Sequence, residues 1–563
     1  MGRQVAIGVQ NFAQLREKDY FYIDKTSFIK EWWDSGDAVT LITRPRRFGK
    51  TLNMSMLECF FSNKYAGRGD LFEGLDVWEE TRFRELQGMY PVVFLSFAGI
   101  KHTNFEETRR AINGLIADLY NDFAGMLQDG MFTEADRKRF SSVSDAMDDV
   151  AAAKSLNLLC KWIERFMGKK CIVLLDEYDT PMQEAYVHGY WDELVAYTRV
   201  LFNNTFKTNP YLERAVLTGI TRVSRESIFS DFNNPNIVTT TSDDYADCFG
   251  FTEKEVFAAM DEQGIPAEEK EKVKFWYDGF TFGKEREIYN PWSIIMYLDK
   301  KRVGTYWANT SGNGLVSKLI REGDVGVKTE FEKLLVGECI EAKIDEQIAF
   351  DQLSGNKNAL WSLLLASGYL KVVRSEFTDD GKYDYQLKLT NFEVKCMFES
   401  MIEGWFNQSR DFGEFVKAML RGEEGIMNDY MNEIALNTFS FFDAGGKGGG
   451  RSHPERFYHG FVLGLIVDRA KDYMVKSNRE SGYGRYDVMM EPKDEKGTAV
   501  IMEFKVLSER AGEESLEDTA ENALRQIEEK HYDADLLQRG IPKERIYQYG
   551  FAFKGEKCLI KKG

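Results

Sequence analysis

The stretch "AVTLITRPRRFGKTLNMSML" (38–57) predicts the fold of the first part of the chain. Its first six residues form an apolar, β-branched run typical of a buried strand, and a helical pattern follows the intervening loop. Gly49, Lys50 and Thr51 match the end of the phosphate-binding motif G-x-x-x-x-G-K-[ST]. In this motif the glycine lets backbone N–H groups approach phosphate, the lysine supplies positive charge and the hydroxyl binds Mg²⁺. We therefore expect an anion site at the N-terminus of the helix.

One position departs from the general motif, because Arg44 stands where the first glycine is expected. The strand–loop–helix context still predicts a nucleotide site. ATP is expected rather than GTP, since no guanine-specifying motif is present. The expected binding residues from the loop and the start of the helix also include Arg46, Arg47, Phe48 and Leu52.

A second motif supports the nucleotide site. The apolar run "CIVLLDEYD" (171–179) reads as a strand ending in Asp176 and Glu177. In that position Asp176 would hold Mg²⁺ through water and Glu177 would polarise the attacking water. Thr218 ends another strand and is expected to sense the γ-phosphate, and Arg222 lies in a loop that would reach the nucleotide. For these last two residues a plain polar strand end remains an equal alternative.

Strand-like and helix-like runs alternate over the first 230 or so residues, which predicts a parallel, three-layer α/β sheet. The predicted strands are 38–43, 91–97, 171–176 and 214–220, and the predicted helices include 106–126 and 155–167. Residues 250–350 are predicted to be mostly helical. Residues 358–394 read as a helix, a strand, a "DDG" turn and a second strand, which is the pattern of a winged-helix module.

The last part of the chain is predicted to be a separate α/β domain. A helical stretch (395–440) leads to a glycine-rich loop (443–457), and the expected elements after it are a helix (455–475), a hairpin (486–506), a helix (515–532) and a strand (547–555). The predicted domains are 1–250, 251–395, 396–442 and 443–563.

Composition limits the function classes. The chain has 563 residues, a net charge of −18, seven scattered cysteines and five histidines. Without a C-x-x-C pair, this pattern argues against a disulfide framework, a structural zinc site or a histidine-rich metal site. No apolar run is long enough for a membrane span and no signal peptide precedes the first domain, so a cytoplasmic protein is expected. The negative charge repels nucleic acid at long range, and any such site must be local or screened by metal.

The hairpin "YDVMMEPKDEKGTAVIMEFKV" (486–506) carries a second candidate site. If its turn centres on Glu495, residues whose numbers sum to 990 face each other, which places Asp487 opposite Glu503. Glu503 and Lys505 are two residues apart and share a face. Two opposed carboxylates destabilise a hairpin unless a cation lies between them. We expect both to bind Mg²⁺ (or Mn²⁺) for phosphodiester hydrolysis, with Lys505 positioning water or stabilising charge.

Several stretches resemble a known family. "YFYIDKTSFIKEW", "RPRRFGKTL", "VLLDEYDTP", "LTGITRVSRESIFSDFNN", "WYDGFTFG" and "YNPWS" together resemble the predicted AAA-ATPase-like proteins of bacteria. That family commonly carries a C-terminal PD-(D/E)XK nuclease-superfamily domain, and its D…E-x-K pattern points to Asp487, Glu503 and Lys505. The resemblance covers nearly the whole chain. In that family the loop is normally arginine-rich where the first glycine would be, so Arg44 fits the family.

The resemblance also suggests further residues for the C-terminal site. Glu455, one turn before His459 on the expected helix, would be another metal ligand, with a capping or solvated acid as the alternative. Gln526 resembles the glutamine that some members place near the substrate. Lys530 stands where a Q-x-x-x-Y pattern has tyrosine, and Tyr532 comes two residues later. Arg485 would contact phosphate or simply be solvated, and the "GGKGGGR" segment is expected to be a flexible linker, with a loop that wraps a backbone phosphate as the alternative.

The sequence therefore predicts a P-loop ATPase joined to a Mg²⁺-dependent nuclease, with nucleic acid, chiefly DNA, as partner and no membrane. Nucleotide would gate the nuclease, in a genome-defence role by analogy with the family. One alternative is a nucleotide-dependent switch that binds nucleic acid or protein without cutting. Another is an ATPase whose C-terminal domain mediates assembly. A homo-oligomer stays open, as does whether Arg222 or Arg225 acts within one chain or across two.

Overall fold

A computed structural model describes residues 2–128, 130–207, 209–221, 235–308, 314–323, 325–335, 337–345, 353, 356–378, 382–407, 412–438, 472–481, 484–494, 497–507, 513–554 and 557–563. The chain divides into two compact units. The first comprises Met1–Leu319 and Gly337–Met397, and the second comprises Ile320–Val336 and Phe398–Gly563. The four domains expected from the sequence remain a finer prediction. In the described part of the chain, no helix combines the length and the hydropathy needed to cross a membrane.

A five-stranded sheet forms the centre of the first unit. Its order is β2-β3-β4-β1-β5, and every neighbouring pair is parallel. The strands are β1 (Val39–Thr43), β2 (Val92–Ser96), β3 (Cys171–Asp176), β4 (Leu212–Gly219) and β5 (Asn236–Val238). The predicted parallel α/β fold and its four strands are confirmed. The three-residue β5 was not predicted, because its sequence carries too short an apolar run.

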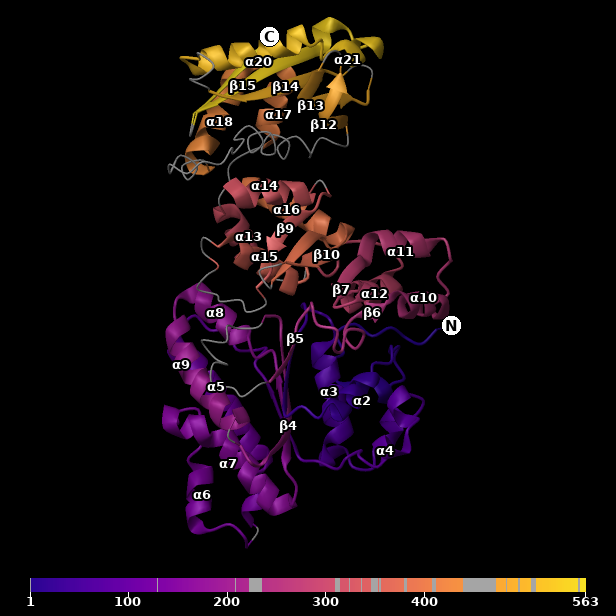
Figure 1. Cartoon of the computed structure of the whole chain (residues 1–563), viewed down its shortest axis with the longest axis vertical. Helices are drawn as coiled ribbons and strands as arrows, with labels where there is room; N and C mark the ends of the chain where they lie inside the picture. The colour runs from indigo at the N-terminus through magenta and orange to yellow at the C-terminus, as the bar shows by residue number, and fades with distance from the viewer. Residues whose placement is uncertain are drawn as a thin grey trace. The chain divides into compact units, whose positions relative to one another are not determined.

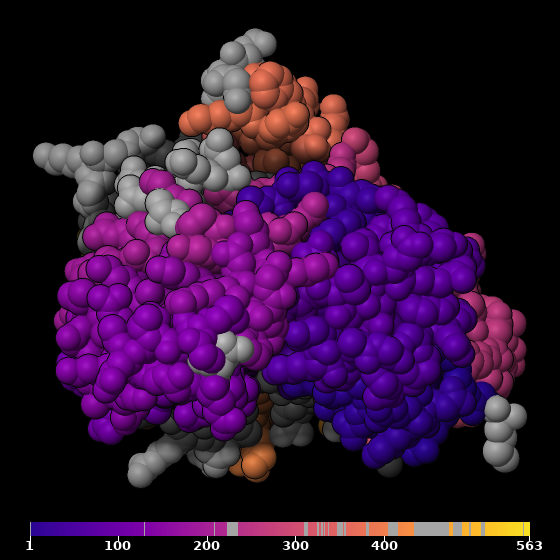
Figure 2. Space-filling view, turned by 90° about the horizontal axis from the view of Figure 1, so that it is seen from below, coloured from indigo at the N-terminus to yellow at the C-terminus, as the bar shows by residue number. Residues whose placement is uncertain are grey.

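Helices cover both faces of this sheet, which explains why β1 and β3 are buried at every position. Leu41, Val173 and Leu217 belong to one hydrophobic core, whereas Ile42, Ile172 and Val216 belong to the other. The first core is closed by α5 (Phe105–Asp122), α7 (Asp149–Met167), α8 (Thr180–His188) and α9 (Trp191–Phe202), with α6 (Glu134–Ser141) beside them. The second is closed by α1 (Phe12–Glu17), α2 (Ser27–Ser35), α3 (Lys50–Phe61) and α4 (Thr81–Arg84). The two layers are visible in Figure 1, and in Figure 2 they lie side by side as an indigo and a magenta half.

The segment after residue 250 is less helical than predicted. It contains a three-stranded sheet of order β6-β8-β7, formed by β6 (Phe251–Thr252), β7 (Asp278–Phe282) and β8 (Glu285–Tyr289). The tight β7–β8 turn uses Gly283 at φ +53°, which a glycine adopts without strain. The helices of this segment are α10 (Glu253–Glu262), α11 (Glu269–Tyr277), α12 (Pro291–Lys300), α13 (Gly314–Glu322) and α14 (Val325–Leu335).

The predicted helix–strand–strand pattern over 358–394 is confirmed. It consists of α15 (Lys357–Ala366), β10 (Leu370–Phe377) and β11 (Tyr383–Leu389). A further strand, β9 (Ile340–Lys343), pairs with β11 in the order β10-β11-β9. The assignment of this segment to the winged-helix class stays a prediction.

The second unit is built on a sheet of order β12-β13-β14-β15-β16. Its strands are β12 (Tyr473–Ser481), β13 (Gly484–Pro492), β14 (Ala499–Val506), β15 (Ile546–Lys554) and β16 (Lys557–Lys562). The predicted hairpin and last strand correspond to β13–β14 and β15, whereas β12 and β16 were missed. Most of the helix expected at 455–475 lies outside the described residues, and 473–475 belong to β12 instead.

Alternate residues of β13 and β14 face two different cores. Val488, Met490 and Met502 pack with residues of α17 (Phe412–Arg421) and α18 (Glu424–Thr438). Met489 and Ile501 pack with residues of α20 (Leu516–Glu529) and α21 (Ala534–Gln538). The helical prediction for 395–440 is confirmed by α16 (Phe392–Asn407), α17 and α18. Because Asp487, Glu503 and Lys505 share the parity of Met489, they lie on the α20 face.

Candidate functional site

The predicted phosphate loop connects β1 to α3. Gly49 immediately precedes the helix with φ +79°, a left-handed conformation that favours glycine, and Lys50 is the first helical residue. The N–H groups of the first helical turn have no partner within a helix, so this end of α3 can bind an anion. The local geometry is therefore the one that the sequence predicted.

Lys50 is directed into its own loop. Its Nζ donates to the backbone oxygens of Arg44 and Pro45, at 2.8 Å each. Burial lowers the pKa of the Lys50 ammonium, while the carboxylates of Glu177, Asp179 and Asp176 oppose that shift. A phosphate group would be a better partner than two carbonyl oxygens, because it adds a negative charge.

Asp176 is joined to Thr51, the other predicted magnesium ligand of this domain, and to Thr218, the predicted γ-phosphate sensor. Its carboxylate accepts hydrogen bonds from Thr51 Oγ1 at 2.7 Å and from Thr218 Oγ1 at 2.5 Å. Strand order explains the trio, because β4 lies between β1 and β3 and ends beside both. The side chain of Asp176 is fully buried, and burial raises the pKa of its carboxyl group against the effect of the two hydroxyls.

Glu177 and a residue that sequence reasoning missed complete this edge of the sheet. Glu177 has φ +52° and accepts a hydrogen bond from Thr180 Oγ1 at 3.2 Å. A left-handed glutamate is strained, and such strain concentrates at functional positions. The missed residue is Asp179, whose Oδ2 accepts from the backbone N–H groups of Ile220 and Thr221 at 3.0 and 2.9 Å. Its signal was the last acid of "DEYD", three residues after Asp176.

The other predicted loop residues are divided between solvent and core. Arg46 donates to the side chain of Gln183 at 3.1 Å, and the Arg47 guanidinium lies 4.6 Å from the ring of Trp292. Phe48 is 1% exposed and packs against the rings of Phe280 and Phe282, and Leu52 packs against the second core. Phe48 and Leu52 can therefore offer phosphate only their backbone N–H groups.

Arg44 explains the missing first glycine. Its buried guanidinium donates to the carbonyl oxygens of Thr43, Thr239, Asp244 and Tyr245, at 2.5–3.4 Å. The guanidinium carbon lies 4.5 Å from the Phe282 ring, and burial lowers the Arg44 pKa to about 10. This arginine ties the loop to the segment after β5 and is not directed at phosphate. Arg222 and Arg225 lie outside the described residues.

A pocket adjoins the loop at the carboxyl end of β4. Polar atoms enter it from Arg46, Gln183 and Thr221, and its apolar wall includes Trp307. It belongs entirely to the first unit. The position follows from the parallel sheet, because ligands of such sheets bind beyond the carboxyl ends of the strands.

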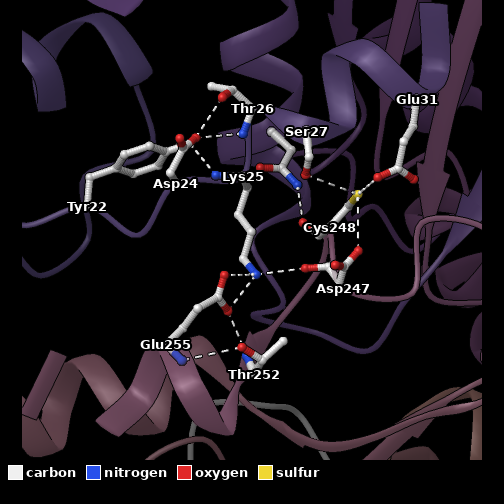
Figure 3. A network of polar contacts seen from close by, with 11 residues as sticks. Tyr22, Asp24, Lys25, Thr26, Ser27, Glu31, Asp247, Cys248, Thr252 and Glu255 are labelled. Atoms are coloured by element: carbon white, nitrogen blue, oxygen red, sulfur yellow. Dashed lines mark hydrogen bonds and ion pairs between the residues drawn. The ribbon is translucent and has the colours of Figure 1, made fainter. Parts of the chain in front are cut away.

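A polar network connects the segment around Lys25 with the segment around Cys248 (Figure 3). Lys25, which is 6% exposed, donates to both carboxylate oxygens of Glu255 and to the backbone oxygen of Asp247, at 2.7 Å each. Asn53 of α3 donates to the backbone oxygen of Cys248 at 3.0 Å. The Cys248 thiol contacts the Glu31 carboxylate at 3.5 Å, and burial raises the thiol pKa. The "YIDKT" motif therefore braces the helix that carries the phosphate loop.

The C-terminal hairpin has the predicted register. Val488 pairs with Met502, Met489 with Ile501 and Met490 with Val500, so Asp487 and Glu503 are the next facing positions. Asp487 Oδ2 accepts a hydrogen bond from the backbone N–H of Phe504 at 2.9 Å. Glu503 is 4% exposed, although it lies near the end of its strand. The structure thus brings the two predicted carboxylates together.

Gln526 of α20 connects the remaining members of this site. Its Oε1 accepts from Lys505 Nζ at 2.8 Å, and its Nε2 donates to Glu503 Oε1 and to the hydroxyl of Tyr532, the latter at 3.2 Å. Lys530 is exposed, so Tyr532 supplies the tyrosine near Gln526. Burial and the charges of Glu503 and Asp487 raise the pKa of Tyr532, and its phenol therefore stays protonated near neutral pH.

The other predicted parts of the C-terminal site lie outside the described residues: Glu455, His459, the side chain of Arg485 and the "GGKGGGR" segment.

Comparison with known proteins agrees with the two sites. Residues 6–229 match a family described as predicted AAA-ATPase, and residues 453–563 match the PD-(D/E)XK nuclease superfamily. The chain carries an AAA-ATPase-like domain and a PD-(D/E)XK nuclease superfamily domain. A protein of Azotobacter chroococcum mcd 1, described as an uncharacterized protein in the vnfD 5′ region, is 25% identical over 570 residues, which cover 99% of this chain and 98% of that protein. The resemblance stated from the sequence is confirmed.

The donor atoms of both domains fit magnesium. The AAA-ATPase-like domain offers the Thr51 hydroxyl and the Asp176 carboxylate, and the nuclease superfamily domain offers the carboxylates of Asp487 and Glu503. Oxygen ligands of this kind are those that Mg²⁺ prefers, and neither set includes a thiolate or an imidazole that would favour zinc.

Proposed function

We propose that this protein binds and hydrolyses ATP with Mg²⁺ at the loop of residues 44–52. We further propose that it cleaves phosphodiester bonds of nucleic acid, chiefly DNA, at the site formed by Asp487, Glu503 and Lys505. The nucleotide state would gate the cleavage. A role in genome defence is supported only by analogy with the family.

One observation carries the nuclease proposal: two carboxylates and an ammonium converge at the ends of β13 and β14, with Gln526 between Glu503 and Lys505. A metal ion bound there would polarise the phosphate and lower the pKa of a bound water. Lys505, held by Gln526, is placed to stabilise negative charge that develops on the phosphate. Tyr532 keeps its proton and can hold Gln526 in place.

The ATPase proposal is supported by the trio around Asp176. Thr51 and Thr218 hold the two oxygens of this carboxylate, so its position is set before a nucleotide binds. Lys50 would exchange its two carbonyl partners for phosphate oxygens. Glu177, beside them at the end of β3, would orient the attacking water.

A cleavage assay tests the proposal. Labelled single- and double-stranded DNA and RNA are incubated with Mg²⁺ or Mn²⁺, with and without ATP. We expect wild type to cut at least one substrate, Glu503→Ala to lose cutting and Lys50→Ala to lose the response to ATP. Glu521→Ala is a matched control, because Glu521 is an exposed acid of α20 that pairs with Lys561 at 2.8 Å.

The alternative outcome points to a different protein class. If wild type hydrolyses ATP but cuts no substrate under any condition, the chain is a nucleotide-dependent switch. The net charge of −18 is the observation that favours this alternative, since it opposes binding to nucleic acid.

A further inference from the structure

Three consecutive residues of the phosphate loop are held by one neighbouring module. This module comprises the last turn of α11, β7, β8 and the start of α12, and it contains the motifs "WYDGFTFG" and "YNPWS". Arg46, Arg47 and Phe48 each contact it through a different chemical group. All of these residues belong to the first unit. The loop is therefore not shaped by its own sequence alone.

Asn290 makes the polar contact. Its Nδ2 donates to the backbone oxygen of Arg46 at 3.3 Å, and its Oδ1 caps α12 by accepting from the N–H groups of Trp292 and Ser293 at 2.9 and 3.3 Å. The residue is 1% exposed. One side chain thus uses its acceptor to begin a helix and its donor to hold the loop.

Arg47 and Phe48 make the other two contacts. Arg47 has φ +65°, which is a strained conformation for a residue with a side chain, and its guanidinium lies over Trp292 at 4.6 Å. Phe48 lies 4.8 Å from Phe280, ring centre to ring centre, in an edge-on arrangement. Stacking on Trp292 and packing of Phe48 offset the cost of this backbone conformation.

The module is itself anchored on its far side. Ser293 Oγ donates to Glu393 at 2.7 Å, and the backbone N–H of Trp307 donates to the other oxygen of Glu393 at 2.7 Å. Glu393 and Ser293 are fully buried. The start of α12 is thus a fixed support against which the loop rests.

We propose that Asn290 and Trp292 are positioning residues of the nucleotide site. They hold the loop so that its backbone N–H groups face phosphate, without contacting the nucleotide themselves. The inference rests on the proposed binding of ATP at this loop. The coupling works in both directions. If the contacts from α12 favour nucleotide binding by a given free energy, bound nucleotide stabilises those contacts by the same free energy.

The test measures the affinity of full-length protein for ATP with Mg²⁺ by calorimetry, together with the melting temperature without nucleotide. Asn290→Ser keeps an oxygen that caps α12 but loses the amide group that donates to Arg46, because the serine hydroxyl lies one bond closer to the backbone. We expect about tenfold weaker binding, the effect of one lost hydrogen bond, with the melting temperature kept. Trp292→Leu should weaken binding about fivefold and Trp292→Phe less, since a smaller ring retains part of the cation–π contact.

Asn356→Ser is the matched control. Asn356 caps α15 with the same pair of hydrogen bonds, from the N–H groups of Asn358 and Ala359 at 3.1 and 3.3 Å. Affinity should be unchanged in this variant. Equal affinity of wild type and Asn290→Ser for ATP would overturn the positioning role. A second contrary result would be that Asn290→Ser and Asn356→Ser lose affinity and melting temperature to the same extent. If wild type does not bind ATP, or if Lys50→Ala binds ATP as tightly as wild type, the proposed nucleotide site itself is wrong, whatever the asparagine variants show.

Discussion

The two candidate sites differ in how far along the chain their partners lie. At the hairpin site the hydrogen bonds of Asp487, Lys505 and Gln526 join residues 17 to 23 positions apart. At the nucleotide site the bond from Thr51 to Asp176 spans 125 positions, and the bond from Asn290 to Arg46 spans 244. A hairpin and the next helix form the first site, whereas the second needs most of the first unit in place.

This difference predicts how substitutions act. At the hairpin site a substitution should change cleavage and little else. At the nucleotide site the same kind of substitution should also change the stability of segments that are distant in sequence, because each residue of the site is held by another helix or strand.

Glu503→Ala should have the largest effect. Removing this carboxylate leaves Asp487 without its facing partner, and cleavage should fall at least about 10³-fold, at the upper end of losses seen when a group that stabilises transition-state charge is removed. ATP hydrolysis should stay within twofold, as roughly expected for a site with local partners. Parallel cleavage and phosphate-release assays measure both. A comparable loss of ATP hydrolysis would show that the hairpin site does not act independently of the nucleotide site.

Glu393→Gln tests the buried carboxyl group that anchors the start of α12, through the pH dependence of protein stability. Burial raises the pKa of Glu393 to about 6, against the hydrogen bonds from Ser293 and Trp307. The folded state therefore binds the proton more tightly than the unfolded chain does. The stability contribution is complete below the ordinary pKa of about 4.5 and is lost as the pH rises through 6, a change of about 2 kcal/mol.

Urea unfolding at pH 4.5 to 7.5 measures this loss. Over that range the stability of Glu393→Gln, relative to wild type, should rise by about 2 kcal/mol. Glu491 of the second unit provides the contrast, because hydrogen bonds and charges from Lys476 and Arg539 outweigh burial and lower its pKa. Its stability contribution is therefore present above pH 4.5 and lost at lower pH, so Glu491→Gln, relative to wild type, should stay nearly constant over this range and gain stability only when the pH falls below 4.5. A flat difference for Glu393→Gln would contradict the raised pKa.

Thr218→Val should have an intermediate effect on the nucleotide site. The valine matches the shape of threonine but cannot donate to Asp176, and losing a hydrogen bond to a charged group should lower kcat for ATP about tenfold. Thr198→Val removes an equally buried hydroxyl, which donates to the backbone of Leu194 at 2.7 Å, and should leave kcat unchanged. Equal kcat values for the two variants would show that Thr218 acts only as packing.

Tyr532→Phe should have the smallest effect. The change removes the hydroxyl near Gln526, and cleavage should fall about fivefold, as for one neutral hydrogen bond. Tyr549→Phe removes a hydroxyl that bonds to the backbone of Met419 at 2.5 Å in the other core, and should lower stability without lowering the cleavage rate. A pure stability effect in both variants would remove Tyr532 from the site.

Three features could be predicted from the amino-acid sequence: the parallel α/β sheet, the strand–loop–helix of residues 38–57 and the hairpin register. These features depend on local patterns: continuous apolar runs, a motif of neighbouring residues, and a period of two on either side of a turn. Asp487 could be paired with Glu503 from the sequence alone, because a turn centre fixes every facing position of a hairpin.

The positions of the remaining side chains depend on tertiary contacts. The end of α20 at Glu529 and the left-handed turn at His531 bring Tyr532, not Lys530, to Gln526. Arg44 donates to carbonyl oxygens about 200 residues away in place of phosphate. Such contacts depend on which distant backbone groups need a hydrogen-bond partner after folding, and this information is not contained in any local stretch of sequence.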